Sequence, residues 1–165
     1  MSRVRALWIE DGVEFECSEL AAPVYLSRRY DLDIALTITD AIAKIQAAEY
    51  GALVFDIRMD PEPPPNWLEQ YQQSRGDKTP PRLGLLLLYS LLKPADDRSV
   101  PIDPIPQWLS SARIGVLSVE TPGEMQEHLT ALRISHHCQK KVPMSPTALL
   151  DLLDEITGIP SGSAA

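Results

Sequence analysis

A short apolar run that ends on a charge constrains this chain more than any other feature. Residues 52–55, Ala-Leu-Val-Phe, contain no polar side chain, and Asp56 follows them directly. An unbroken run of this kind is typical of a parallel strand that is covered on both faces. In an open parallel sheet, ligands bind at the carboxyl ends of the strands. Asp56 therefore caps a turn, binds a metal or attacks an electrophile.

Strand patterns and helix patterns alternate along the rest of the chain. Apolar runs bounded by turn residues predict further strands over 4–9, 33–38 and 113–118, and within 135–142. Apolar residues at helical spacing predict helices after the caps Thr39-Asp40, Thr121-Pro122 and Ser145-Pro146. Strands that alternate with helices predict an α/β fold with a parallel sheet.

Two segments fit more than one element. Residues 13–17 alternate as in a strand, but residues 20–29 have helical spacing, and we favour a helix that Pro23 begins or kinks. The apolar run 83–92, which Lys93-Pro94 ends, fits a strand or a buried helix equally well.

Two proline-rich stretches, 60–82 and 94–112, interrupt this pattern. They hold ten of the fifteen prolines and two of the three tryptophans. Loops of this length in a small domain are usually functional or disordered, and tryptophans argue against disorder. Trp67 and Trp108 either pin these loops to the domain or anchor a partner. We expect residues 60–82 to cover the end of the strand that carries Asp56, with a short helix that begins at Asn66.

The composition excludes several classes of function. The chain has 165 residues and a formal net charge of −8, and it shows no cluster of Lys and Arg, so a nucleic-acid or anionic membrane surface is not expected. The longest apolar run is too short to cross a bilayer, and the N-terminus does not resemble a signal peptide. Cys17 and Cys138 form no disulfide framework, which is typical of free thiols in a reducing cytoplasm.

Charged and hydroxyl side chains gather at the predicted strand ends. The first strand ends at Glu10 and Asp11, the third at Asp56 and the fourth at Ser118, while Lys140 and Lys141 lie near the end of the fifth. Three acids placed together repel one another and favour a divalent cation, and Mg²⁺ prefers such oxygen ligands. An acid cluster with a lysine and a hydroxyl is suited to phosphoryl transfer onto a carboxylate.

The order of these motifs resembles the receiver domains of two-component response regulators. The segments "ALWIED", "DIALTITDAIAKIQAAEYGALVFDIRM", "RLGLLLLYSLL", "GVLS" and "KKVPMSPTALLDLLDEI" are similar in order to that family's strands, turns and helices. The resemblance implies that 83–92 is a helix. It also implies a flavodoxin-like three-layer sandwich with five parallel strands in the order 2-1-3-4-5.

The resemblance implies a role for each acid. Asp56 matches the phosphoacceptor and Asp11 the direct Mg²⁺ ligand. Glu10 matches the acid that acts on the metal through water. Arg58 lies where a backbone carbonyl reaches the metal. The cofactor implied is Mg²⁺.

The resemblance also implies roles for a serine and a lysine at the site. Ser118 matches the switch hydroxyl, and Lys141 or Lys140 matches the lysine that pairs with the phosphoryl group. The separation of 22 or 23 residues between this serine and either lysine is close to the family's usual spacing.

The chain also departs from the family pattern. The gap from Asp56 to Ser118 is 62 residues, about twice the family's usual length, because of the two proline-rich insertions. Val119 stands where the family has a small residue, and His137 or Cys138 stands where it has a switch aromatic. The triplet His136-His137-Cys138 also suggests a zinc site, but adjacent strand residues point to opposite faces.

We therefore expect one receiver-like domain over 1–158, with insertions at 60–82 and 94–112 and a flexible tail at 159–165. The predicted protein is a stand-alone cytoplasmic domain, phosphorylated at Asp56 by a histidine kinase or phosphotransfer protein, that regulates a downstream protein target. It is not an enzyme beyond its own phosphorylation and dephosphorylation. One alternative is a pseudo-receiver that binds a partner without being phosphorylated, and a more remote one is a small phosphate-handling hydrolase.

Overall fold

A computed structural model describes residues 2–12, 18–60, 62 and 82–160 of the chain. In this part of the chain, five strands form one sheet in the order β2-β1-β3-β4-β5, and all the pairs are parallel. The strands are β1 (Val4–Ile9), β2 (Tyr30–Ala35), β3 (Ala52–Phe55), β4 (Ile114–Ser118) and β5 (His136–Gln139). The predicted fold class and strand order are confirmed.

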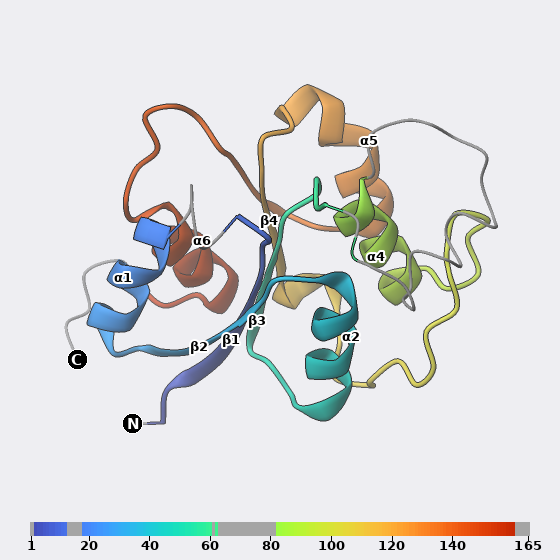
Figure 1. Ribbon diagram of the computed structural model, residues 1–165, viewed down its shortest axis with the longest axis horizontal. Helices are drawn as coiled ribbons and strands as arrows, with labels where there is room; N and C mark the ends of the chain where they lie inside the picture. Colours follow the sequence, from blue (N-terminus) through green and yellow to red (C-terminus); the bar gives the residue numbers. More distant parts are fainter. Residues whose placement is uncertain (1, 13–17, 61, 63–81, 161–165) are drawn as a thin grey trace.

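Helices cover both faces of this sheet (Figure 1). They are α1 (Ser18–Ser27), α2 (Ile38–Ala47), α4 (Leu83–Leu92), α5 (Pro122–Leu132) and α6 (Ala148–Thr157), with a 3₁₀ turn at Ser111–Arg113. The preference for a helix before residue 30 is confirmed: α1 spans Ser18–Ser27, with Pro23 inside it. The run 83–92 is also a helix, as the resemblance implied. Residues 13–17 lie outside the described residues.

Side chains that alternate along each strand divide the core into two layers. Ala6, Trp8 and Val54 face α1 and α6, whereas Leu7 and Phe55 face α2, α4 and α5. The helix α4 lies in the same layer as α2 and α5. Every residue from Leu83 to Leu91 is buried. A helix that is apolar on every side must be enclosed, and the leucines of α4 accordingly belong to the core. None of the helices in the described ranges is long and apolar enough to cross a membrane.

The second strand and its following helix differ from the prediction. The strand begins at Tyr30 and ends at Ala35, instead of running from 33 to 38, and Thr37 is the N-cap instead of Thr39-Asp40. The Thr37 side chain accepts a hydrogen bond from the Asp40 N–H at 3.1 Å. Ile38 is buried as the first residue of α2, so its apolar character belongs to the helix and not to the strand.

The start of the last helix also differs. It begins at Ala148 after the N-cap Thr147, two residues later than Ser145-Pro146 predicted. Ser145 instead accepts a weak hydrogen bond from the Thr147 N–H at 3.4 Å, and the Thr147 hydroxyl donates to Asp151 at 2.8 Å. The capping box predicted at Thr121, with Glu124 as its partner, is confirmed.

The insertion 94–112 is packed against the domain. Trp108 lies against the Tyr50 ring, with 6.2 Å between ring centroids, and the Arg113 guanidinium lies 5.8 Å from the Trp108 ring. Gln46 on α2 donates to the Pro104 carbonyl at 3.1 Å. Trp108 therefore pins this loop to the body of the domain, whereas Trp67 and nearly all of the first insertion lie outside the described residues.

Candidate functional site

The register of β1 and β3 brings two of the predicted acids together. Ile9 pairs with Phe55 across the parallel ladder, so Glu10 and Asp56 both follow the last paired residues at the carboxyl edge. The ladder continues one step further, because the Asp56 N–H donates to the Ile9 carbonyl at 2.9 Å. Parallel strands therefore place acids that lie 46 residues apart in the sequence side by side.

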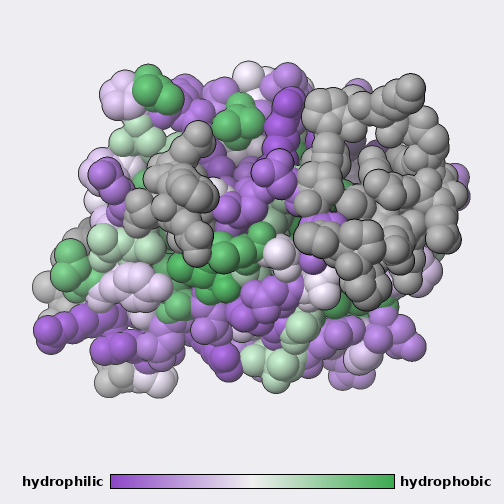
Figure 2. All heavy atoms as spheres, viewed as in Figure 1, coloured by the Kyte–Doolittle hydropathy of each residue, from purple (hydrophilic) through white to green (hydrophobic). Residues whose placement is uncertain are grey.

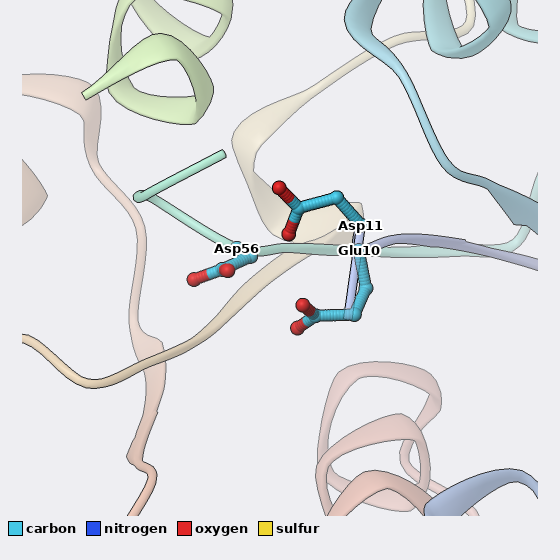
Figure 3. A group of neighbouring side chains, drawn as sticks. All are labelled: Glu10, Asp11 and Asp56. Atoms are coloured by element: carbon cyan, nitrogen blue, oxygen red, sulfur yellow. The ribbon is translucent and has the colours of Figure 1, made fainter. Parts of the chain in front are cut away.

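Three carboxylates form a cluster at this edge. Glu10, Asp11 and Asp56 each offer an oxygen, and these oxygens all lie within 4.8 Å of one another. Figure 3 shows the three side chains grouped around the ends of β1 and β3. Glu10 and Asp56 are only 2% and 4% exposed, whereas Asp11 is half-buried. Two buried acids and a third beside them carry a negative charge that needs compensation.

Lys140 supplies part of that compensation. Its ammonium forms ion pairs with Glu10 and, at 3.3 Å, with Asp56. The Lys140 N–H donates to the Ser118 carbonyl at 2.8 Å, which continues the β4–β5 ladder and fixes the lysine beside the acids. Lys141 is exposed. Of the two lysines that the sequence left open, Lys140 is the one that reaches the site.

Backbone N–H groups hold each acid in place. The Ile57 N–H donates to Asp56 Oδ1 at 2.8 Å, and the Gly12 N–H donates to Glu10 Oε1 at 3.0 Å. Asp11 Oδ2 accepts from the Asp60 N–H at 2.6 Å, so it also fastens the turn that follows Asp56. The carboxylates are thus preorganised by their own turns, and one oxygen of each acid points toward its neighbours.

Burial dominates the acidity of the two buried acids. It raises the pKa of Glu10 to about 7, with the Asp56 charge adding to the shift and Lys140 opposing it. Burial also raises the pKa of Asp56, which Lys140 and the Ile57 N–H oppose. Lys140 is therefore the main group that opposes protonation of the two buried acids.

The raised pKa of Glu10 predicts how stability depends on pH. Between its ordinary value of 4.5 and about 7, the folded protein holds a proton that the unfolded chain has released, so stability falls as pH rises through this window. In the presence of a chelator, we expect the Tm to fall through this window. Glu10→Gln should flatten the profile and raise the Tm above neutral pH. The exposed α5 variant Glu127→Gln serves as the control, and an unchanged slope in Glu10→Gln would contradict the assignment.

The three acids fit a Mg²⁺ site. When all three are ionised, they carry three negative charges against one positive charge on Lys140. Mg²⁺ takes oxygen ligands at about 2.0–2.1 Å, often with one or two carboxylates and water. Oxygens within 4.8 Å of one another need only small shifts to share an ion. His136, His137 and Cys138 belong to no such ligand group among the described residues, so nothing there supports a zinc site.

The strand that ends at Ser118 lies next to β3. Phe55 pairs with Val116, so Ser118 falls at the same carboxyl edge as Asp56. Its side chain is fully buried, and its hydroxyl accepts a hydrogen bond from the Glu120 N–H at 3.3 Å. Ser118 therefore lies in the position that the sequence predicted for it.

Sequence reasoning missed a buried acid beside this serine. Glu120 is 1% exposed and forms ion pairs with Arg58 at 2.7 Å and with Arg82 at 2.9 Å. The only signal in the local sequence was an acidic residue two positions after the serine that ends the strand. Its arginine partners lie 62 and 38 residues away, so no spacing rule could have found them. Arg58, expected to contribute a backbone carbonyl, directs its side chain to Glu120.

Gly84 brings α4 into contact with the turn that follows β3 at Asp56. Its N–H donates to the Ile57 carbonyl at 3.0 Å, and a Cβ at this position would lie 1.7 Å from the Asp56 carbonyl oxygen. Only glycine fits such an approach, which is why the helix can begin directly against the site.

A cavity of about 410 Å³ opens beside Lys140, between the start of α1 and the turn 140–146. Val119 and Val142 line it and are 52% and 103% exposed. Figure 2 shows hydrophobic side chains on the upper left, over the turn after β5, among hydrophilic neighbours.

At the predicted switch-aromatic position, Cys138 packs with the α1–α6 layer.

Comparison with solved structures identifies the fold. The receiver domain of a Francisella response regulator superimposes with a TM-score of 0.60 at 15% identity, over 94% of this chain and 98% of that one. A CheY-like receiver domain from Methanospirillum hungatei gives 0.58 at 17% identity, over 95% of each chain. A Burkholderia pseudomallei response regulator with a phosphorylated aspartic acid, a calcium ion and citrate gives 0.56 at 15% identity, over 94% of this chain and 69% of that one. No family model and no curated protein matches the sequence.

Proposed function

We propose that this chain, which has the fold of response-regulator receiver domains, accepts a phosphoryl group on Asp56 and thereby regulates a protein partner. One observation carries the proposal: Lys140 pairs with Asp56 and Glu10 at the strand ends, and Asp11 completes an acid cluster there. If Asp56 only capped its turn, neither the lysine nor the two further acids would be needed beside it. The expected donor is a histidine kinase or phosphotransfer protein.

The chemistry follows from the side chains present. An oxygen of Asp56 forms a bond to phosphorus, and the bond from phosphorus to the donor nitrogen or oxygen breaks. The leaving group keeps the electron pair and takes a proton from solvent. Lys140 pairs with a phosphoryl oxygen, and the Ser118 hydroxyl donates to another. Mg²⁺, held by Glu10, Asp11 and Asp56 with the carbonyl of Arg58, would neutralise charge on the transferred group.

The similar structures lend support to this chemistry without establishing it. The Burkholderia pseudomallei regulator carries a phosphorylated aspartic acid and a calcium ion on the same fold. At 15% identity, that likeness concerns the fold. The case for this chain rests on its own acids and lysine.

Intact-mass spectrometry tests the proposal directly. Incubation with Mg²⁺ and a small phosphodonor such as phosphoramidate should add one phosphoryl group to the protein, and Asp56→Asn should abolish the adduct. Asp60→Asn, an exposed acid four residues away, is the matched control and should keep it. The absence of any adduct under these conditions, or an adduct that survives Asp56→Asn, would overturn the proposal. Continuous release of inorganic phosphate would point to the hydrolase alternative.

One observation favours the pseudo-receiver alternative. Lys140 already bonds to both buried acids, so much of the cluster is neutralised without a cation. Lys140 therefore competes with Mg²⁺ for the same two acids and would lower their affinity for the ion.

The two functions predict different responses to Mg²⁺. An active receiver should be stabilised, by about 2.7 kcal/mol at a hundredfold excess over the dissociation constant. Thermal melting over increasing MgCl₂, with NaCl at matched ionic strength as the control, measures the effect. A Tm that does not respond to Mg²⁺ would favour a partner-binding module that is not phosphorylated.

A further inference from the structure

Glu120 is buried between two arginines at the edge of the acid site. Its side chain is fully inaccessible, and Arg58 Nε lies 2.7 Å from Glu120 Oε1. Arg82 makes two contacts, from Nε to Oε1 at 3.1 Å and from Nη2 to Oε2 at 2.9 Å. Two-pronged contacts between a guanidinium and a carboxylate fix orientation as well as charge. We call this arrangement of Arg58, Glu120 and Arg82 the arginine clasp.

The clasp joins three segments that border the phosphoacceptor. Arg58 is two residues after Asp56, in the same turn. Arg82 immediately precedes α4 and forms a bridge with Met59, where α4 approaches the Asp56 carbonyl. Glu120 follows the end of β4. The clasp therefore ties the exit of the first insertion and the end of β4 to the phosphoacceptor turn.

The backbone of Glu120 extends this connection to the switch hydroxyl. Its N–H donates to Ser118 Oγ at 3.3 Å. A serine hydroxyl rotates to suit its partners. When one lone pair is occupied by this N–H, the O–H group has fewer directions left in which to donate. The carboxylate of Glu120 thus pairs with the two arginines, while its N–H pairs with Ser118.

We propose that Glu120 is a positioning residue: the arginine clasp on its carboxylate holds the Ser118 hydroxyl where it donates to the phosphoryl group on Asp56. This inference rests on the proposed function. The two guanidiniums also cancel the Glu120 charge, which would otherwise repel an incoming phosphoryl group. Arg58 and Arg82 thereby allow an acid to stand beside an anion site.

A double-mutant cycle tests whether Glu120 acts through Ser118. The probe is beryllofluoride with saturating Mg²⁺, and its affinity is measured by calorimetry in wild type, Glu120→Gln, Ser118→Ala and the double variant. Each single substitution should weaken binding about tenfold, which corresponds to the net loss of one hydrogen bond. The double variant should be no weaker than Ser118→Ala. Mg²⁺ affinity, measured without beryllofluoride, should be unchanged, and Glu127→Gln is the control.

A second variant addresses the possibility that Glu120→Gln does not fold. Arg82→Lys keeps the charge but removes the two-pronged geometry. It should weaken beryllofluoride binding several-fold in the wild-type background and not at all in Ser118→Ala.

Additive losses, or unchanged beryllofluoride affinity in both clasp variants, would show that the clasp only stabilises the fold. That result would overturn this inference and leave the proposed function intact. Wild type that binds Mg²⁺ but no beryllofluoride would overturn the proposed function, and the inference would fall with it.

Discussion

Lys140→Met should lower the free energy of unfolding by about 3–5 kcal/mol, because it removes the cation from two buried acids. The Lys140 side chain is only 12% exposed, and its partners Glu10 and Asp56 are nearly inaccessible. Without the ammonium, both carboxylates must take up protons or remain ionised in a poorly solvated environment. The neighbouring substitution, Lys141→Met, should change stability by less than about 0.5 kcal/mol, since Lys141 is exposed.

Urea unfolding of the two lysine variants at neutral pH measures this difference. Mg²⁺ should restore part of the stability of Lys140→Met, because a cation then replaces the missing charge. Lowering the pH below the raised pKa of Glu10 should act in the same direction, because protonation removes charge from the acids. Equal losses in the two variants, or a greater loss in Lys141→Met, would mean that the lysine beside the acids has been wrongly identified.

Gly84→Ala should destabilise the domain by about 1–3 kcal/mol or more, because the new methyl group cannot fit. A Cβ at this position would lie 1.7 Å from the Asp56 carbonyl oxygen and 3.0 Å from Ile57 Cα. Backbone atoms cannot rotate away as a flexible side chain would, so α4 or the turn at Asp56 must move. The substitution should therefore weaken Mg²⁺ binding as well as stability.

Gly123→Ala is the matched control for this substitution. Gly123 is also near a helix start, in α5, but a Cβ there would meet only Thr121 Oγ1 at 4.0 Å. Alanine should be neutral or stabilising by up to about 1 kcal/mol, since glycine loses more backbone entropy in a helix. Thermal melting and Mg²⁺ titration of both variants check the pair. A Gly84→Ala protein with wild-type Tm would show that the close approach of α4 is not maintained in solution.

Local sequence patterns were sufficient to predict an α/β fold with a parallel sheet, whereas the strand order and the helix over 83–92 were predicted from the family resemblance. An apolar run of strand length, a helix cap and a glycine stop each depend on a few neighbouring residues. Their alternation is compatible with few arrangements. The acids could also be predicted: Glu10, Asp11 and Asp56 follow strands directly, and parallel strands carry whatever follows them to one edge. The boundaries of β2 and α6 were less accurate, since Ile38 and Ser145 suit either side of a junction.

Only the tertiary structure decided which side chains meet at the site. Lys140 and Lys141 are chemically equivalent in the sequence, and the length of the β4–β5 ladder determines that Lys140 faces the acids. Glu120 finds Arg58 and Arg82 through the packing of three separate segments around one buried carboxylate. Such contacts have no sequence period, because they depend on how far each turn projects from the sheet. Local patterns thus placed the acids at the site, and long-range packing selected their cationic partners.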